Sequence, residues 1–181
     1  MVQVTLLDSA FVNIITSSIE VYNKESLGFL IGSKKKNTYI IKSSIAFQNA
    51  ERKVSEVILW ELDEKKVKSV LNFLTGYKIV GDFHSHADEP YKLSRTDKED
   101  LKSTGDSVSL LLVVKKKKKS VKWSYNPRTR ILEGPVDGKY HILLKAYYYD
   151  HSRKKISQAK IICPFIRKLN RIIRQHFNGA A

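Results

Sequence analysis

The chain has 181 residues, a mass of 20.8 kDa and a formal net charge of +15. This length suits one domain with a sizeable core, and a composition that is 42% hydrophobic and 10% aromatic excludes a disordered protein. No stretch approaches the roughly 18 uninterrupted apolar residues of a membrane span, and the first residues, MVQVTLLDSAF, lack the features of a secretory signal. We therefore expect a soluble, cytoplasmic protein.

The positive charge is concentrated in the second part of the chain. Residues 1–106 carry 15 acidic and 15 basic side chains, whereas residues 107–181 carry 3 acidic and 18 basic ones. Such a surface attracts nucleic acid, an anionic membrane or an acidic protein, and the lysine-rich surface of a heat-adapted protein is the alternative. The candidate places for an acidic partner or nucleic acid are residues 115–119 and 164–177.

Hydrophobic spacing predicts six elements before residue 87. In chain order they are a strand at 2–7, a helix from Asp8 or Ser9 to about Asn23, a hairpin of strands at 26–32 and 38–47, a helix from Asp63 to Thr75 that Gly76 stops, and a strand from Lys78 to His86. The run Val57 to Trp60 is a further candidate strand.

The second half is predicted to be richer in strands. A short helix at 96–104 has Thr96 as its cap and Glu99 as its capping-box partner. Strands at 108–114 and 120–125 are expected to form a hairpin whose turn holds the five solvated lysines at 115–119. A second hairpin at 139–149 and 154–163 precedes a last helix that begins at Pro164. This order indicates an α+β (α/β-like) domain built on one mixed sheet.

The segment from Gly81 to Asp97, GDFHSHADEPYKLSRTD, holds candidate metal ligands. On a strand, His84 and His86 point to the same face and can bind one ion together. Asp97 starts the next helix, from which its carboxylate can return to the strand end. Two imidazoles and one carboxylate leave a fourth tetrahedral position for water, as in catalytic zinc sites. Taken singly, these residues are also compatible with a surface histidine pair and ordinary helix-start residues, but their joint spacing favours a site.

Two motifs carry a family resemblance. The first motif reads H-x-H, then seven residues, then S-x-x-D, and its four fixed positions are His84, His86, Ser94 and Asp97. This spacing resembles the signature of the JAMM (MPN+, JAB-domain) zinc metalloprotease family at all four positions. The family also places a glutamate upstream in a pattern like E-x-x-G-x-L-x-G, and residues 25–32, ESLGFLIG, fit it with Glu25, Gly28, Leu30 and Gly32. The resemblance implies a single MPN-type domain with a curved mixed sheet flanked by helices. Residues 1–125 would be its catalytic core, and the basic hairpin and helix of 126–181 would pack as part of the same domain.

The resemblance also implies a mechanism. His84, His86 and Asp97 would hold zinc, Glu25 would accept a proton from the attacking water, and Ser94 would steady the oxyanion. Glu20 and Glu89 are competing base candidates that lack the surrounding pattern. The remaining candidate ligands do not cluster in the sequence, so we expect one zinc ion per chain; they are His141, His151, His176 and Cys163. Cys163 lies in an apolar run and is expected to fill the core.

Three functions compete at this stage. The family implies hydrolysis of the isopeptide or peptide bond after the C-terminus of a ubiquitin-like modifier, with ubiquitin-like protein conjugates as substrates. A second possibility keeps the zinc chemistry but processes a sulfur-carrier protein or a small amide conjugate. A third is a basic module that binds nucleic acid or protein and has an idle metal site, which the complete ligand set disfavours.

Overall fold

The structure is a computed structural model that describes residues 1–47, 51–52, 57–58, 61–87, 91–105, 107–116 and 122–178. Its helices are α1 (Asp8–Glu20), α2 (Glu61–Thr75), α3 (Arg95–Ser103) and α4 (Phe165–Asn178). Its strands are β1 (Gln3–Leu6), β2 (Leu27–Lys35), β3 (Thr38–Ala46), β4 (Glu51–Arg52), β5 (Val57–Ile58), β6 (Lys78–Ala87), β7 (Val108–Lys115), β8 (Ser124–Asn126), β9 (Ile131–Val136), β10 (Tyr140–Asp150) and β11 (Lys155–Ile162). None of these helices combines the length and apolar character needed to cross a bilayer.

One mixed sheet of nine strands organises the molecule, in the order β11-β1-β3-β2-β6-β7-β10-β9-β8. Strand β10 also pairs with β11, so the strands from β11 to β10 close into a ring, from which β9 and β8 extend. This closure is possible because two strands pair with different halves of the same edge of β10. Its first half, Tyr140–Leu144, pairs with β9, and its second half, Ala146–Asp150, pairs with β11. The fold is the mixed α+β architecture that the sequence predicts.

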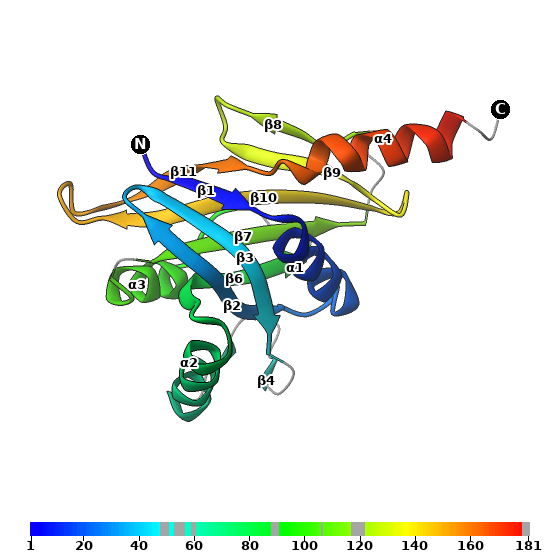
Figure 1. The fold of residues 1–181 in the computed structure, drawn as a ribbon. Helices are drawn as coiled ribbons and strands as arrows, with labels where there is room; N and C mark the ends of the chain where they lie inside the picture. Colours follow the sequence, from blue (N-terminus) through cyan, green and yellow to red (C-terminus); the bar gives the residue numbers. More distant parts are fainter. Residues whose placement is uncertain are drawn as a thin grey trace.

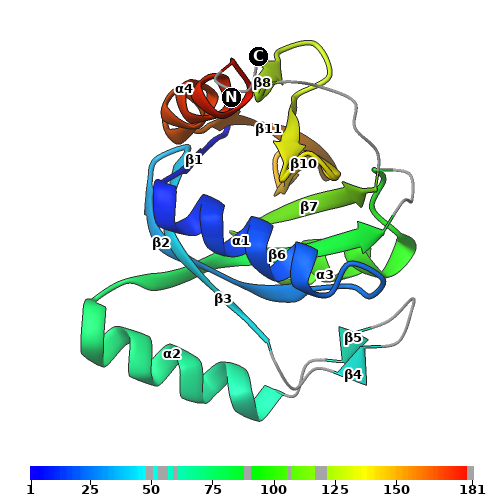
Figure 2. The ribbon, with the colours of Figure 1, turned by 90° about the vertical axis from the view of Figure 1, so that its right-hand side faces the viewer.

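Helix α1 fills the concave side of the curled sheet, and α4 lies across its upper end (Figures 1 and 2). The buried positions of α1 recur at helical spacing on one face; they are Ala10, Phe11, Ile14, Ile15 and Ser18. The apolar residues of that face belong to the largest core cluster. The same cluster contains the alternate residues Leu110 and Leu112 of β7. Helix α2 stands apart from the sheet in both views.

The two faces of β7 are both covered, and this explains its apolar sequence VSLLLVVK. Leu111 and Val113 point away from the main core and belong to two smaller clusters, one of which lies with Leu101 of α3. The parallel register places His84 beside Leu111 and His86 beside Val113. The outer face of the sheet is therefore the face that carries the histidines.

The predicted hairpin of 108–114 with 120–125 is wrong. Strand β7 lies between β6 and β10, and β8 pairs with β9, a strand that the sequence reading missed. Residues 117–121, with three of the five lysines, lie outside the described part of the chain. The predicted hairpin of 139–149 with 154–163 is confirmed as β10 and β11. Helix α1 ends at Glu20, three residues before the predicted end near Asn23.

One polar side chain in the first half of the C-terminal helix, Asn170, ties it to the loop before β8. The backbone N–H of Trp123 donates to Asn170 Oδ1 at 2.7 Å, and Asn170 Nδ2 donates to the Trp123 carbonyl at 2.8 Å. The Trp123 ring is 2% exposed and meets Phe11 edge to face. Phe165, Ile166, Leu169 and Ile173 pack on the core, so the basic side chains of α4 fall on its outer side.

Candidate metal centre

Strand β6 presents His84 and His86 on one face, as their spacing predicts. The two residues are 7% and 6% exposed, and their ring centroids lie 5.2 Å apart. Burial on a central strand restricts both rings, because β2 and β7 pair with β6 on its two sides. The pair is therefore preorganised rather than a pair of mobile surface histidines.

Helix α3 supplies the carboxylate. Ser94 is its N-cap: the N–H of Asp97 donates to Ser94 Oγ at 3.1 Å, and the N–H of Ser94 donates to Asp97 Oδ2 at 2.6 Å. The predicted cap at Thr96 with Glu99 as partner is wrong, and Glu99 instead forms a salt bridge with Arg95. The reciprocal bonds hold the Asp97 carboxylate at the helix start, where it faces the histidines.

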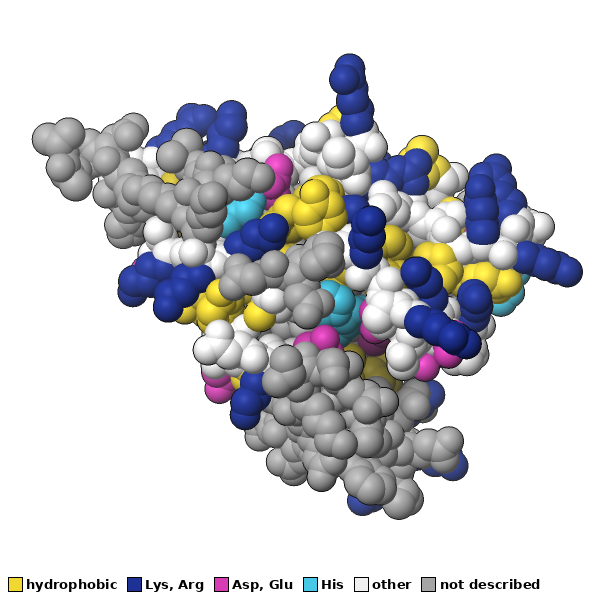
Figure 3. Space-filling view, turned by 180° about the vertical axis from the view of Figure 1, so that it is seen from behind, with side chains coloured by type: hydrophobic (Ala, Val, Ile, Leu, Met, Phe, Trp, Pro, Cys, Tyr) yellow, Lys and Arg dark blue, Asp and Glu magenta, His cyan; other side chains and the backbone are white. Residues whose placement is uncertain are grey.

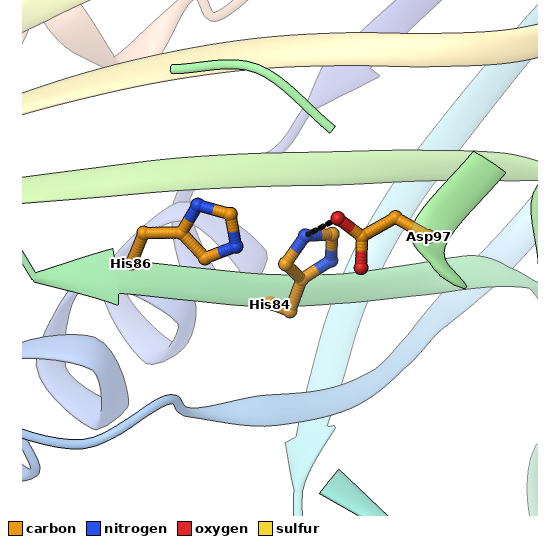
Figure 4. A group of neighbouring side chains, drawn as sticks. All are labelled: His84, His86 and Asp97. Atoms are coloured by element: carbon orange, nitrogen blue, oxygen red, sulfur yellow. Dashed lines mark ion pairs between the residues drawn. The ribbon is translucent and has the colours of Figure 1, made fainter. Parts of the chain in front are cut away.

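The three side chains converge from two elements, as Figure 4 shows. One candidate ligand atom from each of His84, His86 and Asp97 lies within 4.8 Å of the others, and His84 Nε2 is 3.6 Å from Asp97 Oδ2. Ligands of a tetrahedral ion bound at about 2.0–2.1 Å lie roughly 3.3 Å from one another. Small side-chain rotations bring the three atoms to that spacing, so this group can hold a metal ion.

Glu25 approaches the same centre from a position two residues before β2. Its Oε1 lies 3.6 Å from His86 Nε2, and its side chain is 19% exposed. Of the competing bases, Glu20 is an exposed residue at the end of α1, and Glu89 lies outside the described residues. Among the described glutamates, Glu25 is thus the one placed beside the histidines.

A pair of buried serines fixes Glu25 relative to the histidines. The N–H of Ser26 donates to Ser85 Oγ, and the N–H of Ser85 donates to the Ser26 carbonyl, each at 2.9 Å. Ser85 lies between His84 and His86, and both serines are at most 1% exposed. The Ser26 hydroxyl continues to Ser18 of α1 at 3.0 Å. The sequence reading missed this link, although the polar residue inside H-S-H was its visible signal.

Gly28 allows β2 to lie close beside the histidine strand. A Cβ at this position would collide with the carbonyl of Ile45 and with the ring of Phe83, the residue before His84. Gly32 meets the same kind of obstacle at Ile40 on β3, where the register shifts in a β-bulge. Of the two motif glycines, Gly28 therefore serves the site and Gly32 serves the β2–β3 pairing.

Acidic groups set the electrostatics of the centre. Burial alone would lower the pKa of His84, but the adjacent Asp97, with Asp82 and Glu25, raises it above its usual value. Burial opposes ionisation of Asp97, yet His84 and Ser94 hold the pKa of that carboxyl well below its usual range. Burial raises the pKa of Asp82, which accepts a hydrogen bond from Ser109 at 2.6 Å on the same sheet face.

The other residues weighed from the sequence lie away from this centre. His141 is buried on β10 and contacts Glu133 at 3.0 Å, and His151 lies in the exposed β10–β11 turn. Cys163 is 6% exposed in the main core, where burial raises the pKa of its thiol to about 11. Nothing is described of the His176 side chain.

Comparison with known proteins adds a family to this geometry. The sequence pattern described as prokaryotic homologs of the JAB domain matches residues 8–126. The chain belongs to this family. The matched segment of this JAB-domain chain contains Glu25, His84, His86, Ser94 and Asp97.

A solved structure supports the fold. The JAB-domain chain resembles the solution structure of protein DSY2949 from Desulfitobacterium hafniense, with a TM-score of 0.55 and 17% identity over 88% of this chain and 92% of that one. At that identity the likeness concerns the fold alone. No curated protein matches the sequence.

Proposed function

We propose that this JAB-domain chain is a zinc-dependent isopeptidase that hydrolyses the amide bond after the C-terminus of a ubiquitin-like modifier. The observation that carries the proposal is the convergence of His84, His86 and Asp97 with Glu25 beside them. Two imidazoles and one carboxylate match the ligand composition of catalytic zinc sites, which keep one position open. Cytoplasmic location is part of the same proposal.

The residues present fit a zinc ion. His84 Nε2 is buried and, among the described residues, makes no hydrogen bond, although it faces the Asp97 carboxylate. A buried polar atom without a hydrogen bond is costly unless something else satisfies it, and a metal ion would do so. The N–H of Ser94 orients the Asp97 carboxylate, which is the role that outer hydrogen bonds play around metal ligands.

Each side chain then has a defined task. Zinc, when bound, polarises the scissile carbonyl and brings the pKa of water near neutrality. Glu25 accepts the proton of the attacking water and passes it to the leaving amine. The Ser94 hydroxyl donates a hydrogen bond to the oxyanion, while its oxygen accepts the N–H of Asp97.

We also propose that the basic surface of α4 binds an acidic partner or nucleic acid. Its exposed basic side chains are Arg167, Lys168, Arg171 and Arg174. The described part of residues 115–119 is Lys115 at the end of β7 and the exposed Lys116. Which partner these side chains attract remains a prediction.

Metal content tests the site directly. We expect about one zinc per parent chain by elemental mass spectrometry, and its loss in the single variants His84→Ala, His86→Ala and Asp97→Ala. His151→Ala is the matched control, because this histidine is exposed and lies in the β10–β11 turn, away from the metal centre. Full zinc occupancy in all three site variants would show that the ion binds elsewhere.

Turnover tests the chemistry. Parent enzyme is incubated with purified ubiquitin-like conjugates, with and without a zinc chelator, and the products are identified by mass spectrometry. Glu25→Gln should keep zinc but lose roughly 10²- to 10⁴-fold in rate, as loss of a general base commonly does. A Glu25→Gln variant that holds zinc and cleaves at the parent rate contradicts the assigned role.

A further inference from the structure

Two lysines lie near the ring of one tyrosine on the outer face of the sheet, and a third lysine follows that tyrosine in the sequence. The Nζ of Lys145 on β10 lies 4.6 Å from the centroid of the Tyr91 ring, and the Nζ of Lys115 on β7 lies 5.9 Å from it. Lys92 follows Tyr91 directly and acts electrostatically on Lys145. The Tyr91 carbonyl accepts a hydrogen bond from the Tyr147 hydroxyl at 3.4 Å, which ties this loop to β10.

The positive charges of these lysines are not neutralised within the described chain. None of the three forms a salt bridge there. Glu133, on the adjacent strand β9, directs its carboxylate to His141 instead. Burial, together with the charge of Lys92, lowers the pKa of Lys145. A bound anion would therefore reduce the repulsion between these lysines.

The sheet register relates this group to the metal centre. His84 on β6 pairs with Leu111 on β7, which pairs with Lys145 on β10, so the three lie in one row on one face. Adjacent strands are about 4.7–4.9 Å apart, which places the Cα atoms of His84 and Lys145 roughly 10 Å apart. Leu111, in the middle of the row, is buried under Leu93, Leu101 and Tyr147, so a bound peptide would pass beside these side chains and span a few residues between the two ends.

Basic side chains are also abundant on the back face of the molecule. Figure 3 shows a histidine side chain in the middle of the back face, with acidic side chains just below it and Lys and Arg side chains on several sides. The metal centre holds acidic side chains, whereas Lys115 and Lys145 on the same face of the sheet are basic. A substrate with a neutral scissile bond and a nearby anionic group fits this distribution.

We propose that Lys92, Lys115 and Lys145 form a subsite for the carboxylates of an acidic peptide segment a few residues from the cleaved bond. The subsite rests on the proposed function for its relation to that bond, whereas its affinity for an acidic peptide does not. A peptide is favoured over nucleic acid because the proposed reaction cleaves an amide bond at the metal centre, whose His84 lies in the same row of the sheet as Lys145. Nucleic acid is the competing occupant that the test includes.

Binding is measured first, without any requirement for turnover. The probes are a fluorescein-labelled peptide, Gly-Ser-Glu-Glu-Glu-Gly, its counterpart with three glutamines, and a labelled single-stranded oligonucleotide, all at low salt. The triple variant Lys92→Gln, Lys115→Gln and Lys145→Gln should bind the acidic peptide roughly tenfold more weakly, as loss of three partly screened charge contacts predicts. The glutamine peptide should bind poorly to both proteins.

A matched control carries the same change in net charge. Lys35→Gln, Lys36→Gln and Lys154→Gln alter exposed lysines at the end of β2, in the β2–β3 turn and in the β10–β11 turn. We expect this variant to bind the acidic peptide like the parent. Equal weakening by both triple variants shows a general charge effect and overturns the subsite. Loss of oligonucleotide binding with unchanged peptide binding overturns it in favour of nucleic acid. Lys145→Gln alone serves if the triple variant does not fold.

Cleavage separates this inference from the proposed function. Zinc-loaded parent enzyme acts on a peptide library, and mass spectrometry records the residues around each cleaved bond. Enrichment of Asp and Glu within about four residues, lost in the triple variant and kept in the control, supports the subsite. Cleavage with no acidic preference overturns the subsite and leaves the hydrolase. Selective acidic-peptide binding with no cleavage of peptides or conjugates supports the subsite while the proposed hydrolase fails.

Discussion

Replacing Ser85 with alanine removes the hydroxyl that accepts the backbone N–H of Ser26. Both residues are at most 1% exposed, so water cannot take the place of the lost acceptor. A buried donor left without a partner costs about 1–3 kcal/mol of stability. The change also removes one of the two Ser26–Ser85 hydrogen bonds that hold Glu25 beside the histidines, so this proposed general base should become less well positioned.

Urea denaturation of the zinc-free protein measures the first effect. With a slope of about 2 kcal/mol per molar urea, the midpoint should fall by roughly 0.5–1.5 M. Ser18→Ala is the matched control. It also removes a buried hydroxyl from the network, but the N–H of Ser26 keeps its bond to Ser85. We therefore expect a smaller shift in the control.

A double-mutant cycle measures the second effect. Ser85→Ala should lower kcat in the parent and have little further effect in the Glu25→Gln background, because it acts through Glu25. Ser85→Thr, which keeps a hydroxyl at this position, should restore most of the activity. A midpoint within about 0.2 M of the parent would refute the stability argument. Equal rate losses with and without the Glu25 carboxylate would refute the positioning argument.

Three further outcomes are expected from the fold. Gly28→Ala should lower the unfolding free energy by about 1–3 kcal/mol or more, measured by urea denaturation, because its Cβ meets Ile45 and Phe83 in a packed region; a parent-like midpoint would contradict the close approach. The Cys163 thiol, with its pKa raised to about 11, should resist alkylation at pH 8 in the folded protein. Because its folded pKa lies above the unfolded value, stability should decline as the pH rises from about 9 toward about 11, and Cys163→Ala should lessen this decline. Asn170→Ala should lower the melting temperature by roughly 2–4 °C for each kcal/mol lost, since it removes both bonds to Trp123, and an unchanged melting curve would show that α4 is held by its apolar face alone.

Local patterns predicted the centre well. The period of two on a strand places His84 and His86 on one face whatever the strand pairs with, and this expectation held. The capping prediction failed because two overlapping S/T-x-x-D/E patterns lie two residues apart, Ser94 with Asp97 and Thr96 with Glu99. Helix α3 is short and polar, so hydrophobic periodicity could not choose between them.

Long-range pairing was the part that the sequence did not determine. An apolar run such as 108–114 fits equally well beside a neighbouring strand or in the middle of a sheet, and only tertiary packing decides. Strand β9 was missed because Gly134 and Pro135 interrupt its apolar pattern. Gly134 is required there since a Cβ would collide with the Trp123 ring, a contact that no local pattern reveals.

The ring of strands can close only late in the synthesis of this protein, because it joins strands from distant parts of the sequence. Strand β1 is synthesised well before its partner β11, because the two strands lie far apart in the sequence. Until then one edge of β1 has no strand beside it, and β7 similarly waits for β10. A nascent chain that stops after residue 126, where the family match ends, presents both edges to other chains and should aggregate.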